Sequence, residues 1–100
     1  MINLITDTLK KEGNIHIEVK EKNYVTTIFL RKRTEYEKEK GYPTYWITSE
    51  FLNLDCNKFN TLLNAWGDLR KIKKYIKDYV SKQLVEKEIT KITDTKYIFN

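Results

Sequence analysis

The stretch NIHIEVKEKNYVTTIFLRKR, residues 14–33, begins with a clean alternation of apolar and polar residues over residues 14–20, which is typical of a half-buried strand. Ile15, Ile17 and Val19 point to one side, and the residues between them are polar. Residues 21–23 (EKN) form a turn, and residues 24–33 are rich in β-branched and aromatic side chains. This pattern predicts a β-hairpin with one buried face.

The flanks of this hairpin carry weaker signals. Upstream, Ile2, Ile5 and Leu9 recur at helical spacing and Gly13 is a suitable end signal, which predicts a short helix over residues 2–12. Downstream, residues 34–43 alternate charges without an apolar period. That segment is expected to be a solvent loop or an extension of the hairpin.

The second half of the chain has helical spacing. Residues 44–66 are apolar and mostly helical by pattern, although residues 45–47 fit either a third strand or the first turn of a helix. Gly67 then breaks the chain and Asp68 is a suitable N-cap. The long helix after this cap is expected to bury one face and to expose the opposite one. The first face comprises Leu69, Ile72, Ile76, Tyr79, Val80 and Leu84, and the second comprises Arg70, Lys74, Lys77 and Ser81.

The sequence leaves two possible ends for this helix, because Ile89 and Ile92 are spaced to continue it. Residues 95–99 fit a final strand. The predicted fold is therefore a single α+β domain over residues 1–100. It consists of an N-terminal β-hairpin with a short helix, then a helical hairpin, a long amphipathic basic helix and a short C-terminal strand.

The formal net charge of +5 is unevenly distributed. Residues 68–91 hold eight Lys/Arg against four Asp/Glu, so most of the positive charge lies on one short segment. Such asymmetry is typical of a surface that binds a polyanion. The alternative is a solvated helix face that is simply rich in lysine.

Catalytic and metal-binding patterns are missing from the sequence. The chain has one His, at position 16, and one Cys, at position 56, too few for a zinc site. Its glycines, at positions 13, 41 and 67, are isolated and form no phosphate-binding loop. We therefore expect no enzyme and no cofactor, with an all-carboxylate metal site left open. A lone cysteine, no signal peptide and no long apolar run predict a cytoplasmic protein away from membranes.

Residues 49–63 resemble the helix-turn-helix motif of DNA-binding proteins. That motif has a small residue on its first helix, apolar residues around a turn that needs a positive φ, a capping residue, and apolar residues on its second helix. In order, these positions are occupied here by Ser49, Leu52, Asn53, Leu54, Asp55, Phe59 and Leu63. Asn replaces the usual glycine in the turn.

The resemblance implies a second helix from about Asp55 to Trp66, lying in the major groove of DNA. Its core side would carry Phe59, Leu62, Leu63 and Trp66, and its outer, base-reading side Asn57, Lys58, Asn60, Thr61 and Asn64. Arg70, Lys71, Lys74 and Lys77 of the next helix would contact phosphates. Without the motif, Asp55 caps an ordinary helix, and Trp46 and Trp66 are core residues.

Three functions are hypotheses at this point. The first is a small nucleic-acid-binding protein, with duplex DNA favoured, of a virus or mobile element. The second is an inhibitor, of viral or phage origin, that binds a host defence nuclease or another nucleic-acid-binding protein. The third is a structural or assembly protein that forms a homodimer through a sheet edge or the long helix.

Overall fold

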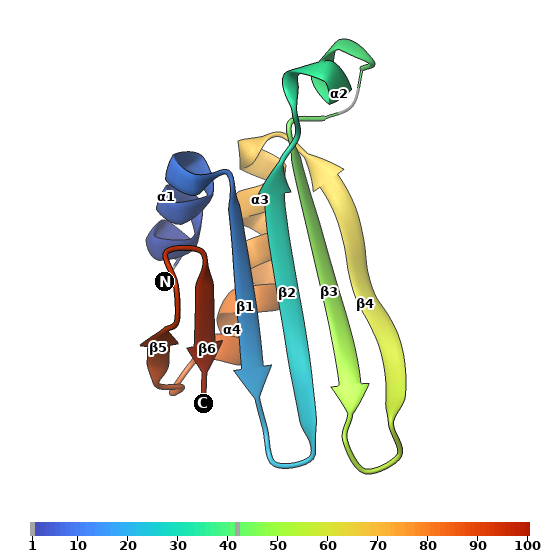
Figure 1. Ribbon diagram of the computed structural model, residues 1–100, viewed down its shortest axis with the longest axis vertical. Helices are drawn as coiled ribbons and strands as arrows, with labels where there is room; N and C mark the ends of the chain where they lie inside the picture. Colours follow the sequence, from blue (N-terminus) through green and yellow to red (C-terminus); the bar gives the residue numbers. More distant parts are fainter. Residues whose placement is uncertain (1, 42) are drawn as a thin grey trace.

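The computed structural model describes residues 2–41 and 43–100. In this part of the chain, one mixed sheet of six strands forms the centre of the protein, in the order β4-β3-β2-β1-β6-β5 (Figure 1). The strands are β1 (Asn14–Lys20), β2 (Tyr24–Lys32), β3 (Tyr45–Asn53), β4 (Lys58–Gly67), β5 (Ile89–Lys91) and β6 (Lys96–Phe99). The helices are α1 (Ile2–Glu12), α2 (Glu35–Glu39), α3 (Leu69–Tyr75), the π-helical turn η1 (Ile76–Val80) and α4 (Ser81–Leu84).

The hairpin predicted from residues 14–33 is confirmed. Strands β1 and β2 pair antiparallel, with Ile15 opposite Leu30 and Ile17 opposite Ile28. The short N-terminal helix is also confirmed, and it ends at Gly13, whose φ of +82° suits glycine. Because α1 packs Ile5 and Leu9 onto this hairpin, the first third of the chain already forms part of the core.

The predicted helical hairpin over residues 44–66 is wrong, because these residues form the antiparallel strands β3 and β4. The turn between the strands explains the difference. Asn53 Oδ1 accepts hydrogen bonds from the backbone N–H groups of Asp55 (2.9 Å) and Cys56 (3.4 Å). Asn57, and not Asn53, has the positive φ, at +53°. The polar cluster therefore closes a β-hairpin instead of capping a helix.

There is a second reason why the apolar residues of β4 have a spacing that predicts a helix. Ser49 lies opposite Leu63 and Glu50 lies opposite Thr61, so Leu62 is an extra, bulged residue. The bulge breaks the two-residue alternation that marks a strand. Moreover, β4 is an edge strand, and the residues expected in the core are largely exposed: Phe59 is 58% exposed, Leu62 54% and Trp66 46%.

The single long amphipathic helix is also wrong, since residues 69–84 form three short segments, α3, η1 and α4. Asp68 is confirmed as the N-cap, because its side chain accepts a hydrogen bond from the backbone N–H of Lys71. The π-helical turn holds more residues per turn than an α-helix, so it changes the direction of the side chains within it and after it. As a result Tyr79, expected on the buried face, is 51% exposed, while the Ser81 hydroxyl, expected outside, is buried.

The two remaining segments differ in how well they were predicted. Residues 89–91 form strand β5 and do not continue the helix, whereas the final strand is confirmed as β6, which pairs parallel with β1. The expected solvent loop, residues 34–43, contains the short helix α2, whose N-terminus is closed by a capping box between Thr34 and Glu37. Tyr42 of this segment lies outside the described residues.

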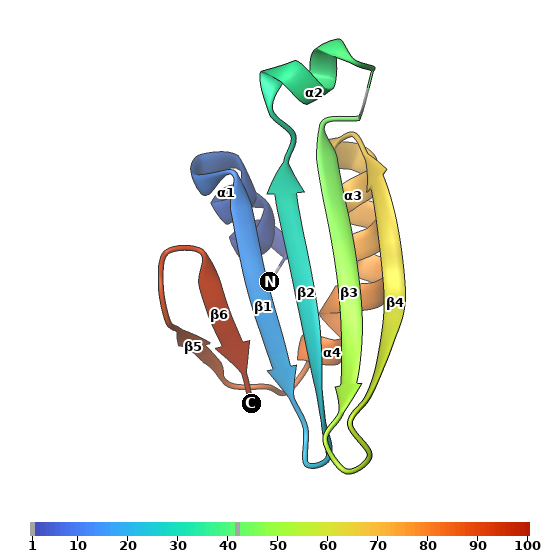
Figure 2. The same ribbon diagram turned by 45° about the vertical axis from the view of Figure 1, so that its right-hand side comes forward.

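The sheet has one covered and one open face. Helix α1 and the segment 69–84 lie on the same side of the sheet, so the other side faces solvent (Figures 1 and 2). The covered face holds the core, in which the fully buried side chains include Ile15, Ile17, Ile28, Leu30, Ile47, Ile72, Ile76, Val80 and Phe99. No helix within residues 2–41 and 43–100 is long and apolar enough to cross a membrane.

Replacing Ile47 by alanine tests this assignment of faces. Ile47 of β3 is fully buried on the covered face, so Ile47→Ala is expected to lower the free energy of unfolding by about 2–5 kcal/mol. The neighbouring Thr48 lies on the open face, and Thr48→Ala is expected to cost less than about 1 kcal/mol. Urea denaturation followed by circular dichroism measures both. Equal losses would contradict the strand assignment of residues 45–53.

Candidate nucleic-acid interface

Five cationic side chains gather on the outer side of α3 and η1, and we call them the basic helix surface. They are Arg70, Lys71, Lys73, Lys74 and Lys77, and all are exposed. Capping by Asp68 starts the helix immediately before them, and the burial of Ile72 and Ile76 turns the helix so that the cations face away from the sheet. This surface lies on the face of the molecule opposite the open face of the sheet.

These cations are poorly compensated. Arg70 Nη2 lies 3.8 Å from Asp68 Oδ2, but its side chain is 93% exposed. The four lysines have no carboxylate within 4.0 Å among the residues that the structure describes. The hydrogen bond from the Lys71 backbone N–H holds the pKa of Asp68 below its ordinary value of 3.8, so this cap stays charged.

Their positions reduce helix stability. Arg70 and Lys71 lie in the first turn, where the helix dipole disfavours positive charge, and that turn contains no acidic residue. Arg70, Lys74 and Lys77 succeed one another at three- and four-residue spacing, where like charges repel by about 0.2–0.5 kcal/mol per pair. These two effects oppose folding slightly, and a bound polyanion would relieve the repulsion.

A hollow of about 330 Å³ lies within this surface. Its lining consists of Lys71, Lys74, Tyr75, Asp78 and Tyr79. The Tyr75 and Tyr79 rings have centroids 6.2 Å apart and planes tilted by 33°. Ammonium groups donate to phosphate oxygens, and aromatic rings offer surfaces for sugars and bases. The hollow thus combines the two kinds of side chain that contact nucleic acid.

The residues predicted to read bases lie elsewhere. Asn57 is in the β3–β4 turn, and Lys58, Asn60, Thr61 and Asn64 are in β4, so they form no helix face. Along a strand they point alternately to the two faces of the sheet instead of converging on one surface. The recognition helix implied by the resemblance is absent from residues 55–66, and the nine predicted residues divide between the β3–β4 hairpin and the helix behind the sheet.

A second cluster, which the sequence did not predict, occupies the open face, and we call it the Trp–Arg cluster. It comprises Arg31, Arg33, Glu37, Trp46 and Trp66. Glu37 accepts hydrogen bonds from Arg31 through both oxygens, at 3.1 and 3.0 Å, and from Arg33 at 2.9 Å. The Arg31 and Arg33 guanidinium carbons lie 5.3 and 5.6 Å from the centroid of Trp46. Arg33 also lies 5.9 Å from Trp66.

Strand register brings this cluster together. Trp46 lies opposite Arg31 on one side and opposite Trp66 on the other, and its indole N–H donates to Asn64 Oδ1 at 2.6 Å. These residues are far apart in the chain, so composition and periodicity hold no signal for them. Both tryptophans lie on the open face and not in the core, and Asn64 holds Trp46 in place.

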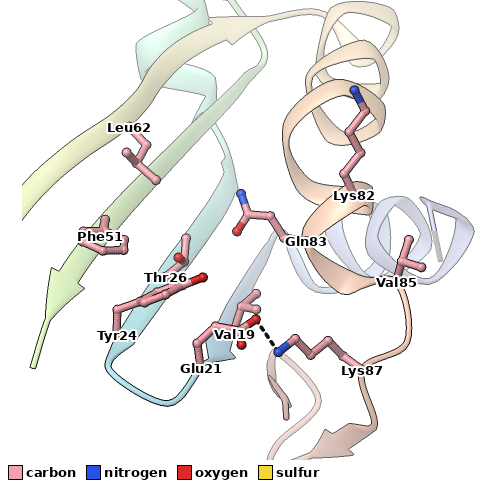
Figure 3. A pocket seen from close by; sticks show the side chains of 10 residues that line it. All are labelled: Val19, Glu21, Tyr24, Thr26, Phe51, Leu62, Lys82, Gln83, Val85 and Lys87. Atoms are coloured by element: carbon pink, nitrogen blue, oxygen red, sulfur yellow. Dashed lines mark ion pairs between the residues drawn. The ribbon is translucent and has the colours of Figure 1, made fainter.

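A groove of about 410 Å³ lies between α4 and the sheet, near the β1–β2 turn (Figure 3). The Tyr24 and Phe51 rings, 4.9 Å apart at their centroids, line its sheet side. Glu21, the one carboxylate in the lining, is paired with Lys87, which also donates to the Lys20 carbonyl at 3.3 Å. Lys82 adds a further positive charge to the rim. Among the described residues, no group of three potential metal ligands lies together here or elsewhere.

The Trp–Arg cluster gives the protein a defined response to acid. The hydrogen bonds from Arg31, together with those from Thr34 and Arg33, lower the pKa of Glu37 from its ordinary value of 4.5 to about 2. As pH falls from about 4.5 to about 2, the unfolded chain takes up a proton at this position before the folded protein does. The contribution of Glu37 to stability is therefore complete above pH 4.5 and is lost as pH falls toward 2.

The test compares the free energy of unfolding at about pH 5 and about pH 3 in urea, values that bracket the titration of the unfolded chain. The decrease between these pH values is expected to be smaller in Glu37→Gln than in the unmodified protein. Glu35→Gln, in the same helix but 85% exposed, is the control and should keep the full decrease. An unchanged decrease in Glu37→Gln would mean that the two arginines do not hold the Glu37 carboxylate in solution.

Comparisons of this chain with models of protein families, with curated proteins and with solved structures gave no significant match.

Proposed function

We propose that this protein binds nucleic acid through the phosphate backbone and that the basic helix surface makes the contacts. One observation carries the proposal: five exposed cations crowd a short helical segment, and two of them lie in its first turn, where the helix dipole disfavours positive charge. Among the described residues, no carboxylate lies within 4.0 Å of the four lysines. Phosphates supply the missing negative charge at a regular spacing. The hollow beside Tyr75 and Tyr79 supports the same proposal, because it places aromatic rings next to two of the lysines.

The proposed contacts are to phosphates, which position a nucleic acid but carry little information about its sequence. Lysine donates to phosphate as a compact charge without a fixed direction, so it tolerates different backbone geometries. We therefore expect affinity that depends strongly on salt and weakly on sequence. Because DNA and RNA share the phosphate backbone, both are expected to bind.

The proposal is tested by fluorescence anisotropy with labelled duplex DNA, single-stranded DNA and RNA across a salt series. Lys73→Glu/Lys74→Glu/Lys77→Glu reverses three charges on the basic helix surface. It is expected to abolish most of the binding. The negative slope of log affinity against log salt should become shallower by about one for each phosphate that the variant no longer binds. The loss of affinity should be similar for different sequences.

The matched control is Lys10→Glu/Lys11→Glu/Lys22→Glu, which changes the net charge by the same amount at exposed positions on α1 and the β1–β2 turn. It should retain most of the affinity and the salt slope. If both triple variants lose the same amount, net charge and not this surface drives binding. If the unmodified protein binds none of the three nucleic acids at low salt, the proposed function is wrong.

A further inference from the structure

The two edges of the sheet are protected to different degrees. Edge strand β5 has three residues, one of which is Lys91, and such short, charged edges are the usual protection against pairing with another sheet. Edge strand β4 has ten residues with a single charge, at Lys58, and no proline. Phe59, Leu62 and Trp66 expose large apolar side chains along β4. Such an edge is open to pairing with a further strand, and the bulge at Leu62 interrupts its regular pattern.

We propose that β4 pairs antiparallel with β4 of a second copy of this chain, so that the two sheets join into one. The pairing is centred between Leu62 and Leu63. It places Phe59 opposite Trp66 of the second copy, and Leu62 opposite Leu63 of the second copy. Lys58, the only charge in the strand, lies opposite Gly67 of the second copy at the ends of the pairing.

The bulge at Leu62 makes this register possible. Residues opposite each other in an antiparallel pair share a face of the sheet. In a regular strand, Phe59 and Trp66 would lie on opposite faces, because an odd number of positions separates them. Here the extra residue restores the match: Phe59 pairs with Leu52 and Trp66 pairs with Trp46, and both point to the open face.

The strand is therefore complementary to itself, which argues for a second copy over an unrelated partner. The register forms an aromatic pair twice, once on each side of the two-fold axis, and such cross-strand pairs stabilise a sheet. It also keeps the two Lys58 side chains at opposite ends, away from each other. A register shifted toward Lys58 would instead bring these charges together and leave Trp66 unpaired.

The proposed axis stands perpendicular to the sheet, because residues on the same face oppose each other. The helices of both copies then lie on one side of the joined sheet, and the two basic helix surfaces share that side. Their mutual repulsion opposes pairing at low salt and is screened at high salt. Added salt is thus expected to strengthen the dimer, whereas it weakens the proposed binding of nucleic acid. The two proposals can fail independently.

Light scattering across a concentration series measures the pairing. The mass of the unmodified protein is expected to rise with concentration from 12.1 kDa to twice that value. Leu62→Lys places two like charges beside the axis and should hold the mass at 12.1 kDa. Leu54→Lys is the matched control, because Leu54 is equally exposed, at 53%, but lies in the β3–β4 turn. That variant should still form the dimer.

A mixture completes the test. Leu62→Glu alone should stay monomeric, and mixing it with Leu62→Lys should restore the doubled mass, because opposite charges then meet at the axis. Circular dichroism confirms that the variants are folded. An unmodified protein that stays at 12.1 kDa at every concentration and salt overturns the proposal. Equal loss of the dimer in Leu54→Lys, or no recovery in the mixture, overturns it as well.

Discussion

The pairing of β2 with β1 on one side and with β3 on the other organises the whole sheet. Its register aligns Ile15, Leu30 and Ile47 across three strands, so one face of the sheet is almost continuously apolar. A face of this kind is stable only when it is covered, and α1 and the segment 69–84 cover it. Every other surface of the protein is defined by its position relative to this covered face.

The covering helices are held by apolar contacts on one side only, which leaves their outer side free for charge. Ile72, Ile76, Val80 and Leu84 are buried at four-residue steps, and the π-helical turn keeps this row facing the sheet. The cations of the basic helix surface face outward because of that orientation. Their mutual repulsion is tolerated because burial of four apolar side chains, each worth about 1.5–3 kcal/mol, outweighs it.

The open face is organised differently, since the helices that pack on the core lie on the other side of the sheet. Glu37 connects α2 to the end of β2 through two arginines, and these arginines lie over Trp46 and Trp66. The carboxylate accepts hydrogen bonds from the guanidinium groups, and these cations in turn make cation–π contacts with the indole rings. This arrangement keeps two large aromatic side chains ordered on a surface that water can reach, beside the edge strand β4.

Local sequence determined the elements whose signals are complete within a few residues, whereas tertiary structure decided those that depend on position in the sheet. The alternation of residues 14–20, the helical spacing before Gly13 and the cap at Asp68 each specify one element, and all three are present. The charge of the segment after Gly67 could likewise be predicted, because it depends on composition alone. The basic part of the candidate site was therefore predictable, and its residues Arg70, Lys71, Lys74 and Lys77 are exposed as expected.

Strand β4 shows why the rest could not be predicted. It lies at an edge and contains a bulge, so neither of its sides is uniformly buried and its apolar residues took a spacing that mimics a helix. The Trp–Arg cluster joins residues as distant in the chain as Arg31 and Trp66, and only strand register places them together. Periodicity reports which way a side chain points within one element, whereas the neighbours of that side chain are set by long-range pairing, which a local pattern does not contain.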